Sequence, residues 1–228
     1  MAPRAVNPHK HAARRDEFID AAQALIQSKG YEQLSIEDVL AEAGSSKGAF
    51  YHYFDSKSAL LGAVIDRMVQ SGVDVVSGVV ANPDLSAVEK LEGYFKTLAA
   101  YKGERREFLL KVIDVWYSDD NAIVRERFRR EAVRLVTPHF ASIIRQGIAE
   151  GTFSLAQPEE MARVVLALMM DTGDEAGQLY LARHADQVTF DEVKQRISTY
   201  EAAIERLLGV SPGTLHLVDE STLNTWFA

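Results

Sequence analysis

Apolar residues recur at helical spacing along nearly the whole chain, and no stretch alternates between apolar and polar residues as a strand would. The repeating residues between 14 and 29 are Phe18, Ala22, Leu25 and Ile26. These four side chains share one helix face, and Gly30 follows as a stop signal. The pattern therefore predicts a first helix over residues 14–29.

Two short helices are predicted next, separated by a tight turn. Ser35 stands where a helix cap is expected, and Gly44 ends the apolar pattern that follows it. Ser45 or Ser46 caps the next helix, which turns Phe50 and Phe54 inward. The spacing over residues 35–54 is typical of a helix-turn-helix.

Longer helices are predicted for the rest of the chain. A fourth begins at Asp55 or Ser56 and reaches Ala81, before Asn82-Pro83 interrupts the pattern. Its apolar stripe consists of Leu61, Val64, Ile65, Met68, Gly72 and Val75/Val76. Further helices are expected over residues 84–102, 104–118, 120–150, 158–185 and 190–208. Pro138 should kink or split the 120–150 helix, and residues 209–228 form a tail of unclear structure that we expect to dock through Trp226 and Phe227.

The outward face of the second short helix suits a DNA groove. At 100° per residue, Gly48 and His52 point away from the two phenylalanines, with Lys47 and Tyr51 beside them. Lys47 can pair with phosphate, Gly48 permits close backbone approach, and the two rings can reach phosphates or base edges. Lys57, near the start of the next helix, adds a second phosphate contact. The alternative is an ordinary packed helix pair that happens to have a glycine turn.

Composition narrows the possible functions. Hydrophobic residues make up 47% and charged residues 25% of the 228, which is typical of a folded soluble protein. The chain has 0 cysteines, which excludes disulfides, cysteine nucleophiles and cysteine-ligated metals. Its net charge of −8 argues against nucleic-acid binding when the whole chain is considered. We expect no secretion signal, no membrane segment, and the cytoplasm as the compartment.

Residues 18–61 resemble the DNA-binding segment of the TetR family of transcriptional regulators. The matching residues are Ala21-Ala22, Leu25, Ile26, Gly30-Tyr31, Ser35-Ile36, Asp38-Val39, Ala43-Gly44, Ser46 to Tyr51, Tyr53-Phe54, Ser56-Lys57 and Leu60-Leu61. The resemblance implies backbone phosphate contacts at Ser35, Lys47, Tyr53 and Lys57. It implies groove or base contacts at Ser46, Gly48, Tyr51 and His52. Tyr31 is expected to pack rather than to touch DNA.

The N-terminal residues are basic and have two open interpretations. Residues 1–15 carry Arg4, Lys10, Arg14 and Arg15 and no acidic residue. This arm could reach phosphates or a minor groove, or it could be a solvated tail.

Two further motifs are expected to carry no chemistry. Residues 44–48 satisfy the Gly-x-Ser-x-Gly pattern of a hydrolase nucleophile elbow, but that elbow needs a preceding strand and the pattern here predicts a helix. The six histidines show no metal-ligand spacing, although His9 and His11 could bind a metal weakly. We predict no catalytic activity, no metal and no cofactor.

The body of the chain is predicted to hold a ligand pocket. An ordinary core would explain its large side chains. In proteins of the resembled family, however, such helices surround an apolar cavity. The side chains nominated as its lining are Phe95, Leu98, Phe108, Ile113, Trp116, Tyr117, Phe128, Met169 and Asp174.

The last two long helices raise the question of a second subunit. The 158–185 helix carries acids and glycines at its centre. Either Asp171 or Asp174 faces a ligand, or Gly173 and Gly177 allow close helix approach while the acids face solvent or a partner arginine. The resemblance implies that this helix and the 190–208 helix form a four-helix bundle with their copies in a homodimer. The candidate contact residues on the 190–208 helix, which could instead be plain core, are Val193, Ile197, Tyr200, Ile204, Leu207 and Leu208.

The resulting hypothesis is an all-α protein in three parts. Residues 1–55 form a helix-turn-helix DNA-binding domain with a basic arm, residues 56–209 form a larger helical ligand-binding and dimerisation domain, and residues 210–228 form the tail. We expect a regulator, most simply a repressor, that binds a palindromic double-stranded DNA operator as a homodimer and is released by a small organic effector. The alternative is a helical small-molecule-binding or enzymatic protein whose helix-turn-helix is only structural.

Overall fold

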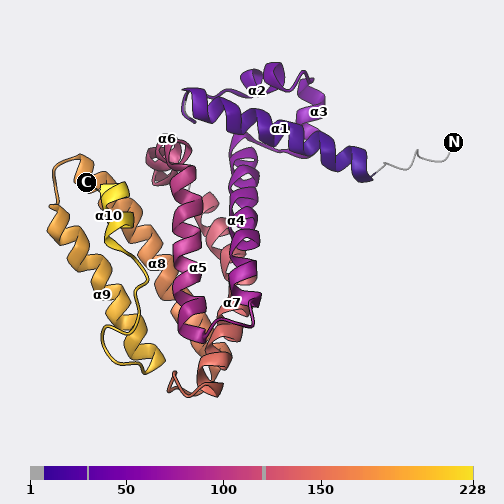
Figure 1. Cartoon of the computed structure of the whole chain (residues 1–228). Coiled ribbons are helices and arrows are strands. Elements are labelled where there is room, and N and C mark those ends of the chain that lie inside the picture. Colours follow the sequence, from indigo (N-terminus) through magenta and orange to yellow (C-terminus); the bar gives the residue numbers. More distant parts are fainter. Residues whose placement is uncertain (1–7, 30, 120–121, 228) are drawn as a thin grey trace. The chain divides into compact units, whose positions relative to one another are not determined.

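The computed structural model describes residues 8–29, 31–119 and 122–227, and every regular element in these ranges is an α-helix (Figure 1). The helices are α1 (Pro8–Lys29), α2 (Ile36–Glu42), α3 (Lys47–Tyr53), α4 (Lys57–Ala81), α5 (Ala87–Glu104), α6 (Arg106–Trp116), α7 (Ala122–Ala149), α8 (Pro158–His184), α9 (Phe190–Leu208) and α10 (Glu220–Phe227). The all-α prediction is confirmed for these residues.

Local capping sets several helix starts. Ser35, Ser86 and Thr189 each accept a hydrogen bond from the backbone N–H three residues ahead, at the first turns of α2, α5 and α9. An acidic side chain at that third position bonds back to the backbone N–H of the cap, which completes a capping box in all three cases. These pairs satisfy N–H groups that a helix start otherwise leaves free.

The chain divides into two compact units. The first groups residues up to Met68 with Arg106–Phe128, so it contains α1, α2, α3, the first part of α4, α6 and the start of α7. Its buried residues include Phe18, Ile26 and Phe50, each 0% exposed. α6 lies against α1 within this unit. This grouping differs from the predicted three-part organisation, in which residues 106–128 belong to the larger helical domain.

The second unit groups Val69–Arg105 with Arg129 onward. Its main core joins apolar side chains of α4, α5, α7, α8 and α9, and the rings of Tyr94 and Phe140 meet edge to face at 4.9 Å. Burial raises the pKa of Tyr94 to about 12. A smaller cluster joins α8, α9 and α10 through Leu179, Val193 and Phe227.

A segment without helix, residues 210–219, follows α9 in the second unit, and we call it the strap. Leu215 and Leu217 of the strap are buried in the main core. Carboxylates from two helices accept hydrogen bonds from its backbone. Glu205 Oε1 lies 3.0 Å from Leu215 N, Glu201 Oε2 2.7 Å from Leu217 N, and Glu92 Oε1 2.9 Å from His216 N.

The structure corrects several element boundaries. α1 begins at Pro8, six residues before the predicted start, and proline is favoured at a first helical position. Pro138 does not split α7, which is continuous around it. α5 continues through the predicted break at Gly103 to Glu104, and α10 was not predicted. Val75, placed on the inner stripe of α4, is 42% exposed, whereas Val76 is fully buried.

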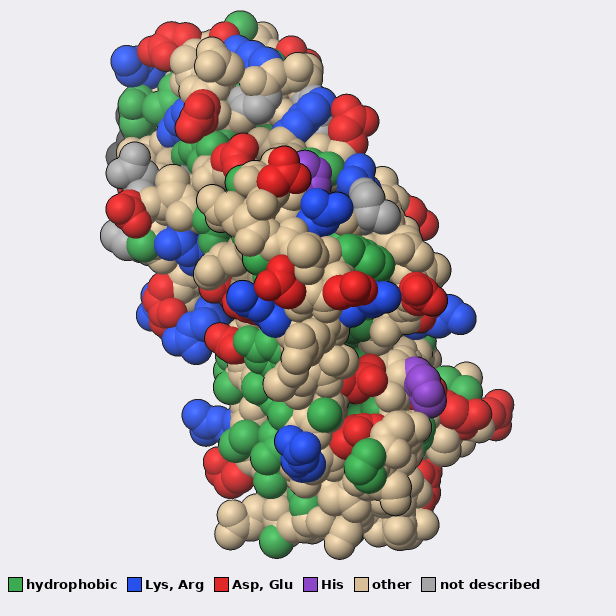
Figure 2. Space-filling view, turned by 90° about the vertical axis from the view of Figure 1, so that its left-hand side faces the viewer, with side chains coloured by type: hydrophobic (Ala, Val, Ile, Leu, Met, Phe, Trp, Pro, Cys, Tyr) green, Lys and Arg blue, Asp and Glu red, His purple; other side chains and the backbone are tan. Residues whose placement is uncertain are grey.

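The outer surface of the described residues is charged in a mixed way. Figure 2 shows acidic and basic side chains interspersed over the face it presents, so the charge of −8 is not gathered into one acidic patch there. Among the helices in the described ranges, none combines the length and apolar character needed to cross a membrane.

Candidate nucleic-acid interface

α2 and α3 are joined by a turn whose backbone is fixed locally. Gly44 has a φ of +55°, in the left-handed region that favours glycine. The N–H of Ser45 bonds the carbonyl of Leu40 at 2.9 Å, and the N–H of Gly44 bonds the carbonyl of Ala41 at 3.3 Å. These bonds close the end of α2 and place α3 directly after the turn.

The inner face of α3 is aromatic. Phe50 and Phe54 are buried, and their ring centroids lie 5.6 Å and 6.2 Å from that of Phe18 on α1. Both contacts with Phe18 are edge to face, a favourable geometry for aromatic pairs. Since these rings are fixed against α1, the opposite face of α3 points outward.

That outward face carries the residues that the sequence pattern placed there. Lys47, Gly48, Tyr51 and His52 are all exposed. Tyr51 is 44% exposed although it is a large apolar-bodied residue, and its ring rests edge to face on Phe50 at 5.3 Å. In the described structure, no atom outside the helix backbone lies within 4 Å of the position that a Cβ on Gly48 would take. The four residues therefore form one open face containing a cation and two polar rings.

An acidic residue borders this face. Glu37 of α2 lies with Oε1 4.0 Å from the Lys47 ammonium, and both side chains are largely exposed. Exposed pairs of this kind contribute at most about 1 kcal/mol. Lys47 is therefore available to an anion at little cost.

Two of the predicted phosphate or groove residues also cap helices. The Ser46 hydroxyl accepts from Ala49 N at 3.3 Å, at the start of α3. The Ser35 hydroxyl donates to Asp38 Oδ2 at 2.6 Å and accepts from Asp38 N at 3.1 Å. Hydrogen bonds from Lys29 and Ser35 hold the pKa of Asp38 well below its usual range. DNA contact by either serine stays a prediction beside this structural role.

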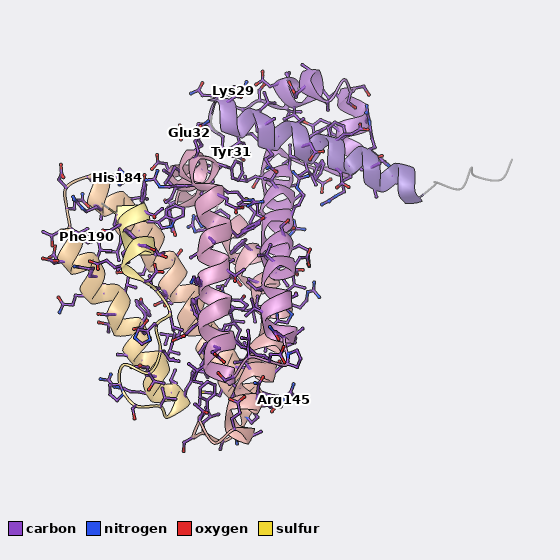
Figure 3. All side chains as sticks on the ribbon, in the orientation of Figure 1. Lys29, Tyr31, Glu32, Arg145, His184 and Phe190 are labelled. Carbon is purple, nitrogen blue, oxygen red and sulfur yellow. The ribbon has the colours of Figure 1, made fainter. Side chains whose placement is uncertain are left out.

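Lys57 lies at the first turn of α4 with its ammonium 4.2 Å from the centre of the Tyr31 ring. Tyr31, labelled in Figure 3, follows α1 and packs here as the sequence suggested. Partial burial lowers the pKa of Lys57 below 10.5. The lysine is held by a cation–π contact at one edge of the helix-turn-helix.

The basic arm is in large part helical. Arg14 and Arg15 lie in α1, where the Arg14 guanidinium pairs with Glu17 and the Arg15 guanidinium lies 5.3 Å from the centre of the Phe54 ring. The interpretation of residues 1–15 as a free arm is therefore wrong for Arg14 and Arg15. Lys10 belongs to α1, and Arg4 lies outside the described residues.

Sequence reasoning missed His11. Its imidazole lies 5.4 Å from the ring of His52 and 4.6 Å from the ring of Tyr53, between centroids. Tyr53, predicted to contact phosphate, is half-buried between these rings and Phe18. The helix-forming residues Ala12 and Ala13, after Pro8, were the available signal that α1 extends this far.

The hydrolase elbow lacks its structural setting. Residues 44–48 follow a helix, and the described ranges contain no strand. The described residues contain no group of three or more His, Asp or Glu side chains arranged to hold a metal ion.

The nominated pocket side chains fall in both compact units. Those in the first unit are Phe108, Ile113, Trp116, Tyr117 and Phe128, and those in the second are Phe95, Leu98, Met169 and Asp174. Trp116 and Phe128 meet edge to face at 5.2 Å, and Phe108 and Met169 are buried. Asp174 is exposed on α8 and accepts from Gln178 at 3.1 Å. Their role in ligand binding stays a prediction.

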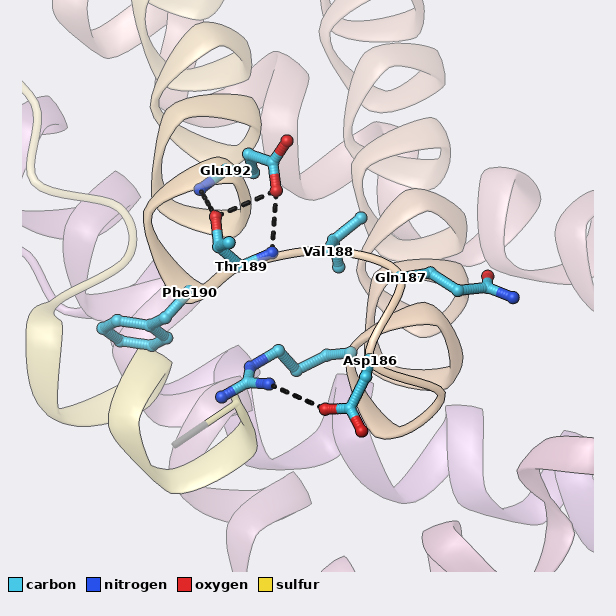
Figure 4. Close-up of a pocket in the computed structure, with 7 residues that line it drawn as sticks. Asp186, Gln187, Val188, Thr189, Phe190 and Glu192 are labelled. Carbon is cyan, nitrogen blue, oxygen red and sulfur yellow. Dashed lines mark hydrogen bonds and ion pairs between the residues drawn. The ribbon is translucent and has the colours of Figure 1, made fainter.

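Two pockets in the second unit lie outside the nominated set. One, of about 280 Å³, is formed around the α8–α9 turn by Arg183, Asp186, Gln187, Val188, Thr189, Phe190 and Glu192 (Figure 4). The other, of about 480 Å³, lies between α7 and the first turns of α8 and is lined by Val133, Arg134, Thr137, Pro138, Ala141, Arg145, Glu159 and Arg163.

The acids at the centre of α8 have partners on α9. Tyr200 donates to Asp171 Oδ2 at 2.7 Å, and the Arg196 guanidinium lies 3.0 Å from Glu175 Oε1. The α9 face nominated for a second subunit is largely internal, because Val193, Ile197, Ile204 and Leu208 are buried in their own chain. The plain-core alternative is correct for these four residues.

Residues 18–64 match the family model described as "Bacterial regulatory proteins, tetR family". This segment contains α2, α3 and the aromatic core described above.

Relatives extend the similarity over most of the chain. An uncharacterized HTH-type transcriptional regulator, YfiR of Bacillus subtilis, is 25% identical over 211 residues, which cover 87% of this chain and 91% of that protein. The HTH-type transcriptional repressor KstR2 of Mycolicibacterium smegmatis is 24% identical over 80% of this chain and 93% of its own length. The crystal structure of RolR with its ligand resorcinol shares the fold, with a TM-score of 0.62 and 17% identity over 96% of this chain and 95% of that one.

Proposed function

This chain is a TetR-family transcriptional regulator, and we propose that it represses transcription by binding a palindromic DNA operator as a homodimer, until a small organic effector releases it. The observation that carries the proposal is the outward face of α3. Lys47, Gly48, Tyr51 and His52 are exposed together there while the opposite face is fixed in the aromatic core.

The chemistry of this face fits a major groove. An exposed lysine and two exposed polar rings can donate to phosphates and base edges, and the glycine allows the backbone close to the duplex. A helix of seven residues reads few base pairs alone. Two copies related by a two-fold axis would reach successive grooves about 34–36 Å apart, which requires a palindrome.

The exposed stripe of α8 is the surface that we propose for the second subunit. Its members recur every three or four residues and are Val164, Ala167, Asp171, Asp174 and Gln178. Val164, 48% exposed, is its largest apolar side chain. Sedimentation velocity tests this surface. Val164→Glu should shift the protein toward monomer, while Val75→Glu, at a similarly exposed valine of α4, should not.

The effector is proposed to be a small, largely apolar organic molecule, because the nominated side chains are mainly aromatic. An effector can release DNA only through a difference in its affinity for the two states of the protein. A coupling of about 1–3 kcal/mol would change operator affinity by about 5- to 150-fold. Resorcinol, the ligand in the RolR structure, is the first compound to titrate against the protein–DNA complex.

Selection of bound duplexes from random DNA, followed by a gel-shift titration, tests DNA binding. We expect a palindromic sequence to be enriched and its affinity to fall steeply with salt, because phosphate neutralisation releases counterions. Lys47→Ala should weaken binding and reduce the salt slope by about one ion per contact. Tyr51→Phe separates the contribution of the hydroxyl from that of the ring.

Lys96→Ala is the matched control, since it removes an exposed lysine from α5 in the other unit. It should leave operator affinity unchanged. If no duplex is enriched, or if Lys47→Ala and Lys96→Ala bind alike, the alternative of a helix-turn-helix used only for packing is favoured. Ester hydrolysis that disappears in Ser46→Ala would instead indicate an enzyme.

A further inference from the structure

The first turns of α1 pack on the last turn of α3 through three rings. His11, His52 and Tyr53 contact one another pairwise, with centroids 5.4 Å (His11–His52), 4.6 Å (His11–Tyr53) and 5.1 Å (His52–Tyr53) apart. We call these three residues the ring cluster. His52 and Tyr53 belong to the proposed DNA interface, whereas His11 has no role in it so far.

The ring cluster is attached to the core on one side and open on the other. Tyr53 is half-buried, and its centroid lies 5.9 Å from that of the fully buried Phe18. His11 is half-buried, whereas His52 is exposed. Because His11 and Phe18 are seven residues apart in one helix, they lie on the same face of α1. The fixed face of α1 thus extends from the core to the edge of the outward face of α3.

Arg14 and Arg15, which lie between His11 and Phe18 in α1, also hold α1 against the helix-turn-helix. The Arg14 guanidinium lies 5.8 Å from the centre of the Phe18 ring and donates to the Gly44 carbonyl at 3.4 Å, at the α2–α3 turn. The Arg15 guanidinium lies 5.3 Å from the centre of the Phe54 ring. α1 therefore contacts both the turn that precedes α3 and the residues at its end.

From this geometry we propose that His11 is a positioning residue for DNA recognition, which holds the His52 imidazole and the Tyr53 ring in the orientation that the duplex meets. The inference rests on the proposed function, since it names a residue that acts on the same interface. An exposed imidazole with no neighbour samples several rotamers, and ordering one such side chain on binding costs about 0.5–1.5 kcal/mol. Contact with both His11 and Tyr53 removes part of that freedom before DNA arrives.

The expected effect is a loss of affinity without a loss of charge contacts. His11→Ala and His11→Gln should each weaken operator binding by about 2- to 10-fold per subunit, the equilibrium equivalent of that ordering cost. His11→Phe keeps a ring at this position and should restore most of the affinity. The slope of log affinity against log salt should stay at the value of the unmodified protein, because no phosphate contact is removed.

The experiment is an anisotropy titration of these variants on the duplex that the unmodified protein selects, over a series of salt concentrations. His184→Ala is the matched control, because His184 also lies on a tyrosine ring, with centroids 4.0 Å apart from Tyr180, but on α8 in the other unit. Circular dichroism melts establish that each variant is folded. His11→Gln serves if the alanine variant is not, since glutamine keeps a polar side chain of greater length at this position.

A double-mutant cycle tests the route of the effect. If His11 acts through His52, His11→Ala should cost less in a His52→Ala background than alone. In the free protein, His11→Ala should also shift the ring-proton NMR signals of His52 and Tyr53, while His184→Ala leaves them in place.

Three results would overturn the inference. They are unchanged affinity in both His11→Ala and His11→Gln, full additivity with His52→Ala, and a salt slope reduced by about one ion per subunit, which would make His11 itself a phosphate contact. Absence of binding by the unmodified protein to any duplex would contradict the proposed function as well. Unchanged affinity of the His11 variants alongside normal binding by the unmodified protein contradicts the positioning role alone.

Discussion

The helix-turn-helix of α2 and α3 and the strap of residues 210–219 are held in place by opposite kinds of contact. The caps and turn of the helix-turn-helix join residues close in sequence, such as Ser35 with Asp38 and Ser45 with Leu40. The strap has little regular structure of its own, and its backbone is bonded by carboxylates of α5 and α9. His216 and Glu92 are 124 residues apart in the chain.

This difference separates local from long-range stabilisation. The helix-turn-helix keeps its shape through caps and an aromatic core. On its outer face, the serine caps and the contacts of His52 in the ring cluster also have a structural role. The strap is held by the carboxylates of Glu92, Glu201 and Glu205, which accept from its N–H groups, and by burial of Leu215 and Leu217 in the main core. Variants in each region should therefore differ in which part of the protein they disturb.

The largest effect is expected at the aromatic core of the first unit. Phe50→Ala removes a fully buried ring that contacts Phe18 and Phe54, and such truncations cost about 3–5 kcal/mol. Urea denaturation followed by circular dichroism measures the loss. Operator binding should fail because the first unit no longer folds. A loss under about 1 kcal/mol would mean that local caps alone maintain this region.

A smaller effect is expected at the strap. Glu205→Ala leaves the buried N–H of Leu215 without its acceptor, and a hydrogen bond to a charged group contributes about 1.5–3 kcal/mol. Hydrogen exchange should show faster exchange at Leu215, and at Leu217 if the strap opens as a unit. Exchange in α2 and α3 should not change. Faster exchange in both regions would show that the two are not independent.

Two glycines with positive φ, one at each region, should differ in how strongly they resist substitution. Gly44 in the helix-turn-helix has φ +55° and open space around its Cβ position, so Gly44→Ala should cost about 1–2 kcal/mol from backbone strain. Gly209, which caps α9 just before the strap, has φ +69°, and a Cβ there would lie 2.5 Å from the Ser154 carbonyl oxygen. Gly209→Ala should be the more destabilising of the two in thermal melts. Equal losses would indicate that residues around Ser154 move aside.

The smallest effect is a change in the response to acid. Burial tends to raise the pKa of Glu205, but hydrogen bonds from the Leu215, Gly213 and Thr214 N–H groups lower it below 4.5. Since the folded pKa lies below the unfolded value, this stabilisation is present above about pH 5 and is lost as pH falls through the folded pKa.

Glu205→Gln cannot titrate at this position, so it should lose less stability than the unmodified protein between pH 6 and 3. One group changes the slope by at most about 1.4 kcal/mol per pH unit. Urea unfolding at several pH values measures the difference. Parallel curves for the two proteins would contradict the assignment.

The same contrast explains what could be predicted from sequence. The start of α2, the turn at Gly44 and the inward phenylalanines of α3 depend on residues within a few positions of one another, so periodicity and capping rules predict them. The strap could not be predicted, because its partners come from distant helices. The contact of His11 with α3 was missed for the same reason, together with a misplaced start of α1.

The candidate site was predictable in orientation but not in its internal bonds. Helical spacing places Lys47, Tyr51 and His52 outward, and the structure agrees. No spacing rule indicates that Glu37 lies beside Lys47 or that Lys57 lies over Tyr31, because both depend on how the helices cross.

Gly48 is the second residue of α3 and lies in open space, so nothing within the described fold forbids a side chain there. A glycine inside a helix costs about 0.5–1 kcal/mol relative to alanine, which means that the free protein would melt at a higher temperature as Gly48→Ala. Under the proposed function, however, a methyl group at that point would stand between the helix backbone and the DNA. On the same premise, Gly48 lowers thermal stability but allows close approach to DNA, and selection for heat resistance alone would favour a change that impairs operator binding.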